Sequence, residues 1–133
     1  MLRVPTQLSD DLEDLVHRTI GCCIDVHRAL GPGLLESIYS RAVCIELTHS
    51  GIAYEREKVI PVTYRDELLC SQRLDIVVAN QIVLEIKAVE RLHPVHRAQA
   101  VTYLRVSKLP IALLMNFNVP ILKTGIKRIA LAL

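Results

Sequence analysis

The sequence predicts an α/β (α+β) domain in which helices flank a central mixed β-sheet. Three observations predict it. The length of 133 residues suits one domain with a buried core, and 51% hydrophobic against 23% charged residues is typical of a globular chain. Helical spacing of apolar residues comes first and short β-branched runs follow, in the order α-α-β-β-β-α-β-β. No repeat or linker divides the chain, so residues 1–133 are expected to form a single domain.

Two helices are expected before the first strand. Ser9 is a candidate N-cap, and the acidic residues after it suit the positive end of a helix dipole. Apolar residues then recur at helical spacing up to Gly31-Pro32-Gly33, which stops the helix. A second helix is expected over 34–50, closed by Gly51, and residues 1–9 are expected to form a loose tail.

The remainder of the chain alternates between strand and helix signals. Asn80-Gln81 separates two β-branched runs as in a hairpin, and Pro94 suits the first turn of a helix. The continuous apolar run at 111–117 has the length of a buried strand. The expected elements are strands at 58–64, 68–79, 82–89 and 111–117, a helix at 94–106, and an edge strand or hairpin within 121–131.

Composition argues against a membrane protein and against a disulfide or zinc scaffold. No apolar run approaches the ~20 residues that a membrane-spanning helix needs. The N-terminus lacks the apolar core of a secretory signal, so a cytoplasmic location without a membrane partner is expected. The cysteines form no C-x-x-C pair and are expected in the core as small hydrophobic residues. They are Cys22, Cys23, Cys44 and Cys70.

Charge is unevenly distributed along the chain. The formal net charge is only +2 and aromatic residues make up 4%, which argues against binding nucleic acid by base stacking or bulk charge. Residues 91–133, however, contain seven Lys and Arg and no acid. This asymmetry indicates either an anionic partner for the C-terminal third or solvated bases balanced in space by acids elsewhere.

Charged residues interrupt two of the expected strands. Glu85 and Lys87 are two apart in an apolar strand and therefore share a face, and Asp75 interrupts the strand before. Two carboxylates on neighbouring strands beside an ammonium group suit a hard divalent cation. The alternatives are a solvent-facing sheet edge and a plain Glu–Lys pair.

The turn between these two strands decides whether the carboxylates can meet. A two-residue turn at Asn80-Gln81 would place Asp75 opposite Ile86. Asp75 would then lie on the wrong face to share a metal with Glu85. We therefore expect a three-residue loop or a β-bulge at this position.

Two expected helices carry further polar candidates. Each alone is also compatible with an ordinary helix position, buried or solvated. The candidates are Gly33, Glu36 and Tyr39, spaced i, i+3, i+6 at the second helix, and His96, Gln99 and Tyr103 on the third.

Taken in order, these motifs resemble those of the PD-(D/E)XK nuclease superfamily. The last motif is similar to that of its RecB-like and Cas4-like branch, and the segment at 26–39 resembles the GxxExxY family of small prokaryotic proteins. The resemblance covers roughly residues 12–130 and implies a restriction-endonuclease-like core. The motifs are G33-x-x-E36, D75, E85-x-K87 and Q99-x-x-x-Y103, with further matches at 88–90, 94–99 and 116–117.

The resemblance implies metal-dependent hydrolysis of phosphodiester bonds, in DNA rather than RNA. Asp75, Glu85 and the backbone carbonyl of Ile86 would bind Mg²⁺ or Mn²⁺. Glu36 would hold a second ion or an outer-shell water. Lys87 would orient the attacking water and stabilise developing negative charge.

The resemblance also implies the substrate contacts. Gln99 and Tyr103 would position the nucleic acid, and the basic C-terminal third would bind phosphates. His27, His96 and Tyr39 are second-tier site candidates, and a core or helix-capping role is the alternative for His27. The cysteines that hold an iron–sulfur cluster in Cas4-like relatives have no equivalent here, so no cluster is expected.

Two other classes of function stay open at this stage. One is a catalytically silent module that keeps the nuclease fold and binds nucleic acid or protein. The other is a small-ligand α/β domain whose charges form a structural cluster. We expect no separate specificity domain within these 133 residues, so a homodimer or a partner protein is a candidate source of specificity.

Overall fold

A five-stranded mixed sheet forms the centre of the structure, a computed structural model that describes residues 8–131. The strands lie in the order of the chain, and β3 pairs in parallel with β4 while the other neighbours are antiparallel. This arrangement confirms the expected fold class and element order. The strands are β1 (Tyr54–Tyr64), β2 (Glu67–Val78), β3 (Ile82–Lys87), β4 (Ile111–Asn116) and β5 (Ile126–Ile129), with a short 3₁₀ helix, η1 (Leu122–Gly125), before β5.

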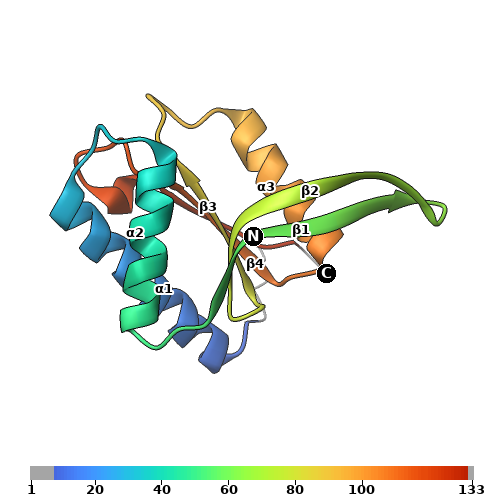
Figure 1. Cartoon of the computed structure of the whole chain (residues 1–133), viewed down its shortest axis with the longest axis horizontal. Coiled ribbons are helices and arrows are strands. Elements are labelled where there is room, and N and C mark those ends of the chain that lie inside the picture. The colour runs from blue at the N-terminus through green and yellow to red at the C-terminus, as the bar shows by residue number, and fades with distance from the viewer. Residues whose placement is uncertain (1–7, 132–133) are drawn as a thin grey trace, which may run out of the picture.

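Helices cover both faces of this sheet (Figure 1). The helices α1 (Asp10–Leu30) and α2 (Glu36–His49) pack on one face, and α3 (Pro94–Ser107) packs on the other. Each face therefore has its own apolar cluster, as a sheet with both sides covered requires. Within residues 8–131, none of the helices is long and apolar enough to cross a bilayer.

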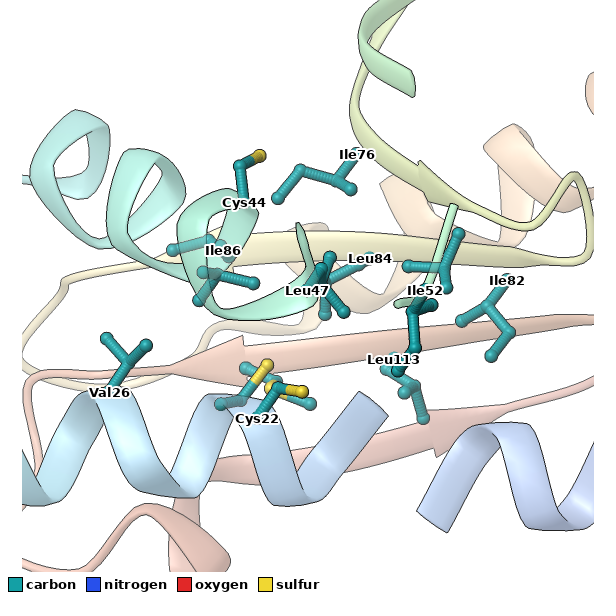
Figure 2. Packing of buried hydrophobic residues seen from close by; sticks show 14 of the residues in the cluster. Cys22, Val26, Cys44, Leu47, Ile52, Ile76, Ile82, Leu84, Ile86 and Leu113 are labelled. Atoms are coloured by element: carbon teal, nitrogen blue, oxygen red, sulfur yellow. The ribbon is translucent and has the colours of Figure 1, made fainter. Parts of the chain in front are cut away.

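The larger cluster lies between the sheet and the α1–α2 pair. Figure 2 shows Cys22 of α1 and Leu47 of α2 converging on strand residues such as Leu84 and Leu113. Alternate residues of β3 face this cluster, while Val83 of the same strand faces α3. Since Glu85 and Lys87 follow Val83 with the same alternation, β3 directs them to the α3 side.

Three of the four cysteines lie in the core as expected, but the expectation is wrong for Cys70, which is exposed. Cys70 belongs to the hairpin of β1 and β2, which extends beyond the helices (Figure 1). Residues 63–71 of this hairpin are all exposed. Burial raises the pKa of Cys23 and of Cys44, which keeps these core thiols protonated.

Glycines and one tyrosine set the start of α2. Gly33, expected at the helix, instead precedes it with φ of 102°, a left-handed conformation that few other residues adopt readily. The hydroxyl of Tyr39 donates to the Gly31 carbonyl at 2.5 Å and accepts from Leu34 N–H at 3.1 Å. These bonds hold the loop and make Glu36 the first residue of α2.

The first helix, α1, begins two residues after Leu8, the first residue that the structure describes. Ser9 caps α1 by accepting a hydrogen bond from Leu12 N–H at 3.1 Å. Leu8 packs against the larger cluster. Residues 1–7, which make up most of the expected loose tail, lie outside the described residues.

The α2 helix offers a matched test of the core. Leu47 is fully buried and Ile45, two residues away, is 57% exposed. We expect Leu47→Ala to lower the free energy of unfolding by about 2–5 kcal/mol, because the cavity adds to the lost transfer free energy. Ile45→Ala should change it by less than about 0.5 kcal/mol. Urea denaturation measures both, and equal effects would contradict this packing.

Candidate active site

The loop between β2 and β3 brings the two strand carboxylates close to each other. Val78 pairs with Ile82 and Ile76 with Leu84, so the loop has three residues, 79–81, as expected. Ala79 and Asn80 take left-handed conformations with φ of 48° and 55°. Asp75 and Glu85 follow one residue beyond Ile76 and Leu84, the last pair of this ladder, so they lie close to each other on neighbouring strands.

Each of these carboxylates bonds to the backbone of the other strand. Asp75 N–H donates to Oε1 of Glu85 at 3.2 Å, and Ile86 N–H donates to Oδ2 of Asp75 at 3.0 Å. The regular backbone pairing of β2 and β3 ends at Ile76 and Leu84. Beyond this pair, the two carboxylates link the strands. These hydrogen bonds to the backbone of the sheet fix the orientation of both carboxylate side chains.

The site places a second carboxyl group beside Asp75 where little water reaches it. Glu85 is only 3% exposed, which is incompatible with the alternative of a solvent-facing edge. Burial, followed by the negative charge of Asp75, raises the pKa of Glu85 from 4.5 to about 8. The pKa of Tyr103 is also raised, by burial and then by the charges of Glu85 and Asp75. Tyr103 of α3 packs in the apolar cluster on the face of the sheet to which β3 directs Glu85.

Lys87 and Gln99 meet at the edge of this group. Nζ of Lys87 donates to Oε1 of Gln99 at 3.5 Å, which links the end of β3 to α3. The ion pairs found within residues 8–131 are Lys58 with Glu55 and Arg128 with Glu13, so Glu85 and Lys87 do not form the plain pair considered as an alternative. The structure thus gathers Lys87 and Gln99 with Asp75, Glu85 and Tyr103.

Glu36 approaches from the opposite side of the sheet. Its Oε2 accepts a hydrogen bond from Ala88 N–H, directly after Lys87, at 3.2 Å. Glu36 also lines a pocket of about 270 Å³ together with Asp75 and Ile86. Asp75 therefore connects the buried group on the α3 side with a pocket on the α2 side.

The structure places two second-tier candidates in the core. Nε2 of His27 lies 3.1 Å and 2.8 Å from the backbone oxygens of Phe117 and Val119, and its side chain is buried. Tyr39 is fully buried and stacks on Phe117 with the ring centroids 4.7 Å apart. These contacts stabilise the turn after β4 and do not bring either side chain to the carboxylate pair.

The third such candidate caps a helix. Nδ1 of His96 accepts a hydrogen bond from the backbone N–H of His93, the N-cap of α3, at 3.1 Å. This contact satisfies one of the amide groups that a helix start leaves without a partner. No contact with Lys87 or Gln99 is recorded for His96.

Asn116 lies in the matched segment 116–117, but sequence reasoning assigned it no role in supporting the site. It is 3% exposed; its Oδ1 accepts from the N–H groups of Val89 and Asn118, both at 3.1 Å. Its Nδ2 donates to the Val89 carbonyl at 2.9 Å. Asn116 thus holds the segment between Lys87 and α3. The available signal was an amide at the end of an otherwise apolar buried strand, where a polar group needs partners.

The donor chemistry of the pair fits a divalent cation. Asp75 and Glu85 offer the oxygen ligands that Mg²⁺ and Mn²⁺ prefer, and a cation would offset the repulsion that raises the pKa of Glu85. Among the residues that the structure describes, no three His, Cys, Asp or Glu side chains form a metal-binding group. A bound ion would therefore take further ligands from backbone oxygen, water or substrate.

Two carboxylates and a lysine on adjacent strands of a restriction-endonuclease-like core define a nuclease-like class of protein. A family model described as the PD-(D/E)XK nuclease superfamily matches residues 13–129. The chain therefore belongs to the PD-(D/E)XK nuclease superfamily. No match was found among curated proteins or among solved structures.

The raised pKa of Glu85 predicts a pH-dependent stability of the metal-free protein. Between about pH 4.5 and 8 the native state keeps the Glu85 proton and the unfolded chain has lost it. The unfolded state then binds fewer protons, so the free energy of unfolding falls as pH rises through this window, by at most about 1.4 kcal/mol per pH unit.

A neutral replacement isolates this contribution. Glu85→Gln should flatten the decline when urea denaturation with a chelator is followed across the window, whereas Glu67→Gln at an exposed hairpin position should leave it unchanged. An equally steep decline in Glu85→Gln and wild type would contradict the assignment.

Proposed function

We propose that the protein is a Mg²⁺- or Mn²⁺-dependent nuclease that hydrolyses phosphodiester bonds in DNA. The observation that carries the proposal is the carboxylate pair of Asp75 and Glu85 on β2 and β3, with Lys87 next to it on β3. A nuclease-like function follows from membership of the superfamily. The choice of DNA, the metal and the roles of individual residues are our proposals.

The proposed metal ligands are Asp75, Glu85 and the backbone carbonyl of Ile86, with Glu36 as a ligand of a second ion or of an outer-shell water. A bound divalent ion supplies Lewis-acid polarisation of the phosphate and activation of water. The hydrogen bonds of the pair to backbone N–H groups keep both carboxylates oriented before substrate arrives. This preorganisation lowers the cost of forming the reactive complex.

Lys87 is the proposed catalytic cation. An ammonium group has three donors, and Gln99 accepts from Lys87. Donors remain for the attacking water and for the oxygen on which negative charge develops. Lys87 is half-buried at the end of β3. A substrate can therefore reach its ammonium group, and the surrounding protein keeps part of the solvent away from it.

Substrate binding is assigned to α3 and to the basic C-terminal third. Gln99 is exposed beside Lys87, and Tyr103 lies next to the carboxylates, so both suit positioning of a nucleic-acid backbone. Within residues 8–131, Arg128 is the one base of the C-terminal third that forms an ion pair, which favours an anionic partner over acids balancing these bases within the chain.

We further propose that the chain belongs to the GxxExxY group near the RecB-like and Cas4-like branch, acts in the cytoplasm of a prokaryote, and obtains specificity from a second copy or a partner protein. The sequence motifs named above support this placement. A catalytically silent binding module is the second candidate function. It would keep the metal and nucleic-acid sites and lack turnover.

Cleavage assays test the proposal directly. Single- and double-stranded DNA and RNA are incubated with Mg²⁺ or Mn²⁺, with the wild type and with Lys87→Ala. We expect wild-type cleavage of DNA and a rate reduced about 10²–10³-fold in Lys87→Ala, because a donor to the developing charge is lost.

Lys58→Ala is the matched control. Lys58 also lies in the sheet, but its Nζ bonds to Glu55 and Asn80, toward the β2–β3 loop and away from Lys87. Its removal should leave the rate unchanged. Wild-type cleavage no faster than that of Lys87→Ala with either metal would reject the enzyme, and retained DNA binding would then favour the silent module.

A further inference from the structure

A pocket between α2 and β1 contains residues to which the proposed mechanism gives no role. We call it the α2–β1 pocket. Its volume of about 270 Å³ corresponds to about nine water molecules at the ~30 Å³ that each occupies in the liquid. It therefore has room for a phosphate group together with water. Its lining consists of Glu36, Ser37, Ser40, Arg56, Glu57, Asp75 and Ile86.

An irregularity in β1 brings two successive side chains into this pocket. Neighbouring residues of a regular strand point to opposite faces, yet Arg56 and Glu57 both line the pocket. Glu57 has φ of 56°, a left-handed conformation that is uncommon for glutamate. It also interrupts the ladder, because Arg56 and Lys58 have partners on β2 whereas Glu57, opposite Asp75, has none recorded. Strained conformations of this kind gather at functional sites.

Arg56 is available to a ligand. Acidic residues line the same pocket, but within residues 8–131 Arg56 forms no ion pair. Arg56 of β1 lines the pocket together with residues of α2. Ser37 and Ser40 are one turn apart on that helix and present hydroxyl groups to the same space.

Two of the three carboxylates that line the pocket are already partly compensated, and the third, Glu57, is exposed to water. Glu36 accepts a hydrogen bond from Ala88 N–H and Asp75 accepts one from Ile86 N–H. A guanidinium group and two hydroxyl groups are the donors with which proteins bind phosphate oxygens, and the planar arginine side chain matches two oxygens at once. Asp75 and Ile86, two of the proposed metal ligands, also line the pocket.

We propose that the α2–β1 pocket binds the phosphodiester next to the scissile one in the nucleic-acid strand, with Arg56 as its charged ligand and Ser37 and Ser40 as hydroxyl donors. The inference rests on the proposed nuclease function and adds substrate-binding residues to it. It also gives the left-handed Glu57 a role, which is to turn Arg56 toward the strand.

DNA binding without turnover tests the inference. Short fluorescent DNA oligonucleotides, single-stranded and duplex, are titrated with Lys87→Ala protein across a salt series and followed by anisotropy. Adding Arg56→Gln should weaken binding about tenfold, the effect of losing a charge-assisted hydrogen bond. It should also reduce the slope of log affinity against log salt by about 0.7–0.9, the value for one phosphate contact.

Three further variants make the result specific. Arg73→Gln removes an exposed arginine of β2 outside the pocket and should change neither affinity nor slope. Arg56→Lys keeps the charge and should restore the slope with only part of the affinity. Ser40→Ala should weaken binding without changing the slope. Thermal unfolding of each variant checks that the fold is retained, which the exposure of Arg56 favours.

The outcomes separate this inference from the proposed function. Unchanged affinity and salt slope in Arg56→Gln, with wild-type cleavage that depends on Lys87, would overturn the pocket inference alone. A wild type that neither cleaves nor binds DNA would overturn both. Equal losses in Arg56→Gln and Arg73→Gln would also overturn it, because the effect would then be one of overall charge.

Discussion

The register between β2 and β3 is the constraint on which the site depends. Strand side chains alternate between faces, so a shift of one residue would send Asp75 to the face opposite Glu85. The three-residue loop at 79–81 sets the register, and its two left-handed residues are in a conformation that asparagine tolerates better than most residues. A short stretch with no catalytic group of its own thereby determines whether the carboxylates meet.

Once the carboxylates meet, burial determines their chemistry. Glu85 is covered by α3 and faces a second negative charge, so its pKa rises, and the pair is costly to ionise without a cation. The surrounding protein offers only partial compensation, through backbone N–H groups and the half-buried Lys87. Two carboxylates under these conditions favour the binding of a positive ion. Without a cation, burial and the charge of Asp75 make the protonation of Glu85, and with it the stability of the protein, depend on pH.

Local patterns predicted the helices, the strands and the paired carboxylates, because periodicity, helix caps and turn length depend on residues that are close together in the sequence. The features that escaped prediction depend on distant parts of the chain. Cys70 is apolar in character but lies on a hairpin that no helix covers, and Asn116 acquires its role only where β4 reaches Val89. The left-handed Glu57 was also missed, because it lies in the charged run 55–58, just before the strand expected at 58–64, and nothing in that run indicates a broken ladder.

The small number of aromatic residues limits how a nuclease built on this chain could bind nucleic acid. Of the four tyrosines and one phenylalanine, Tyr39 and Phe117 stack in the core and Tyr103 is buried beside the carboxylates. Tyr54 is half-buried against the core, which leaves Tyr64, at the tip of the β1–β2 hairpin, as the one aromatic side chain that is largely exposed. Stacking on successive bases needs several such platforms. A nuclease built on this chain would therefore hold the phosphate backbone, for which it has unpaired basic side chains on several elements.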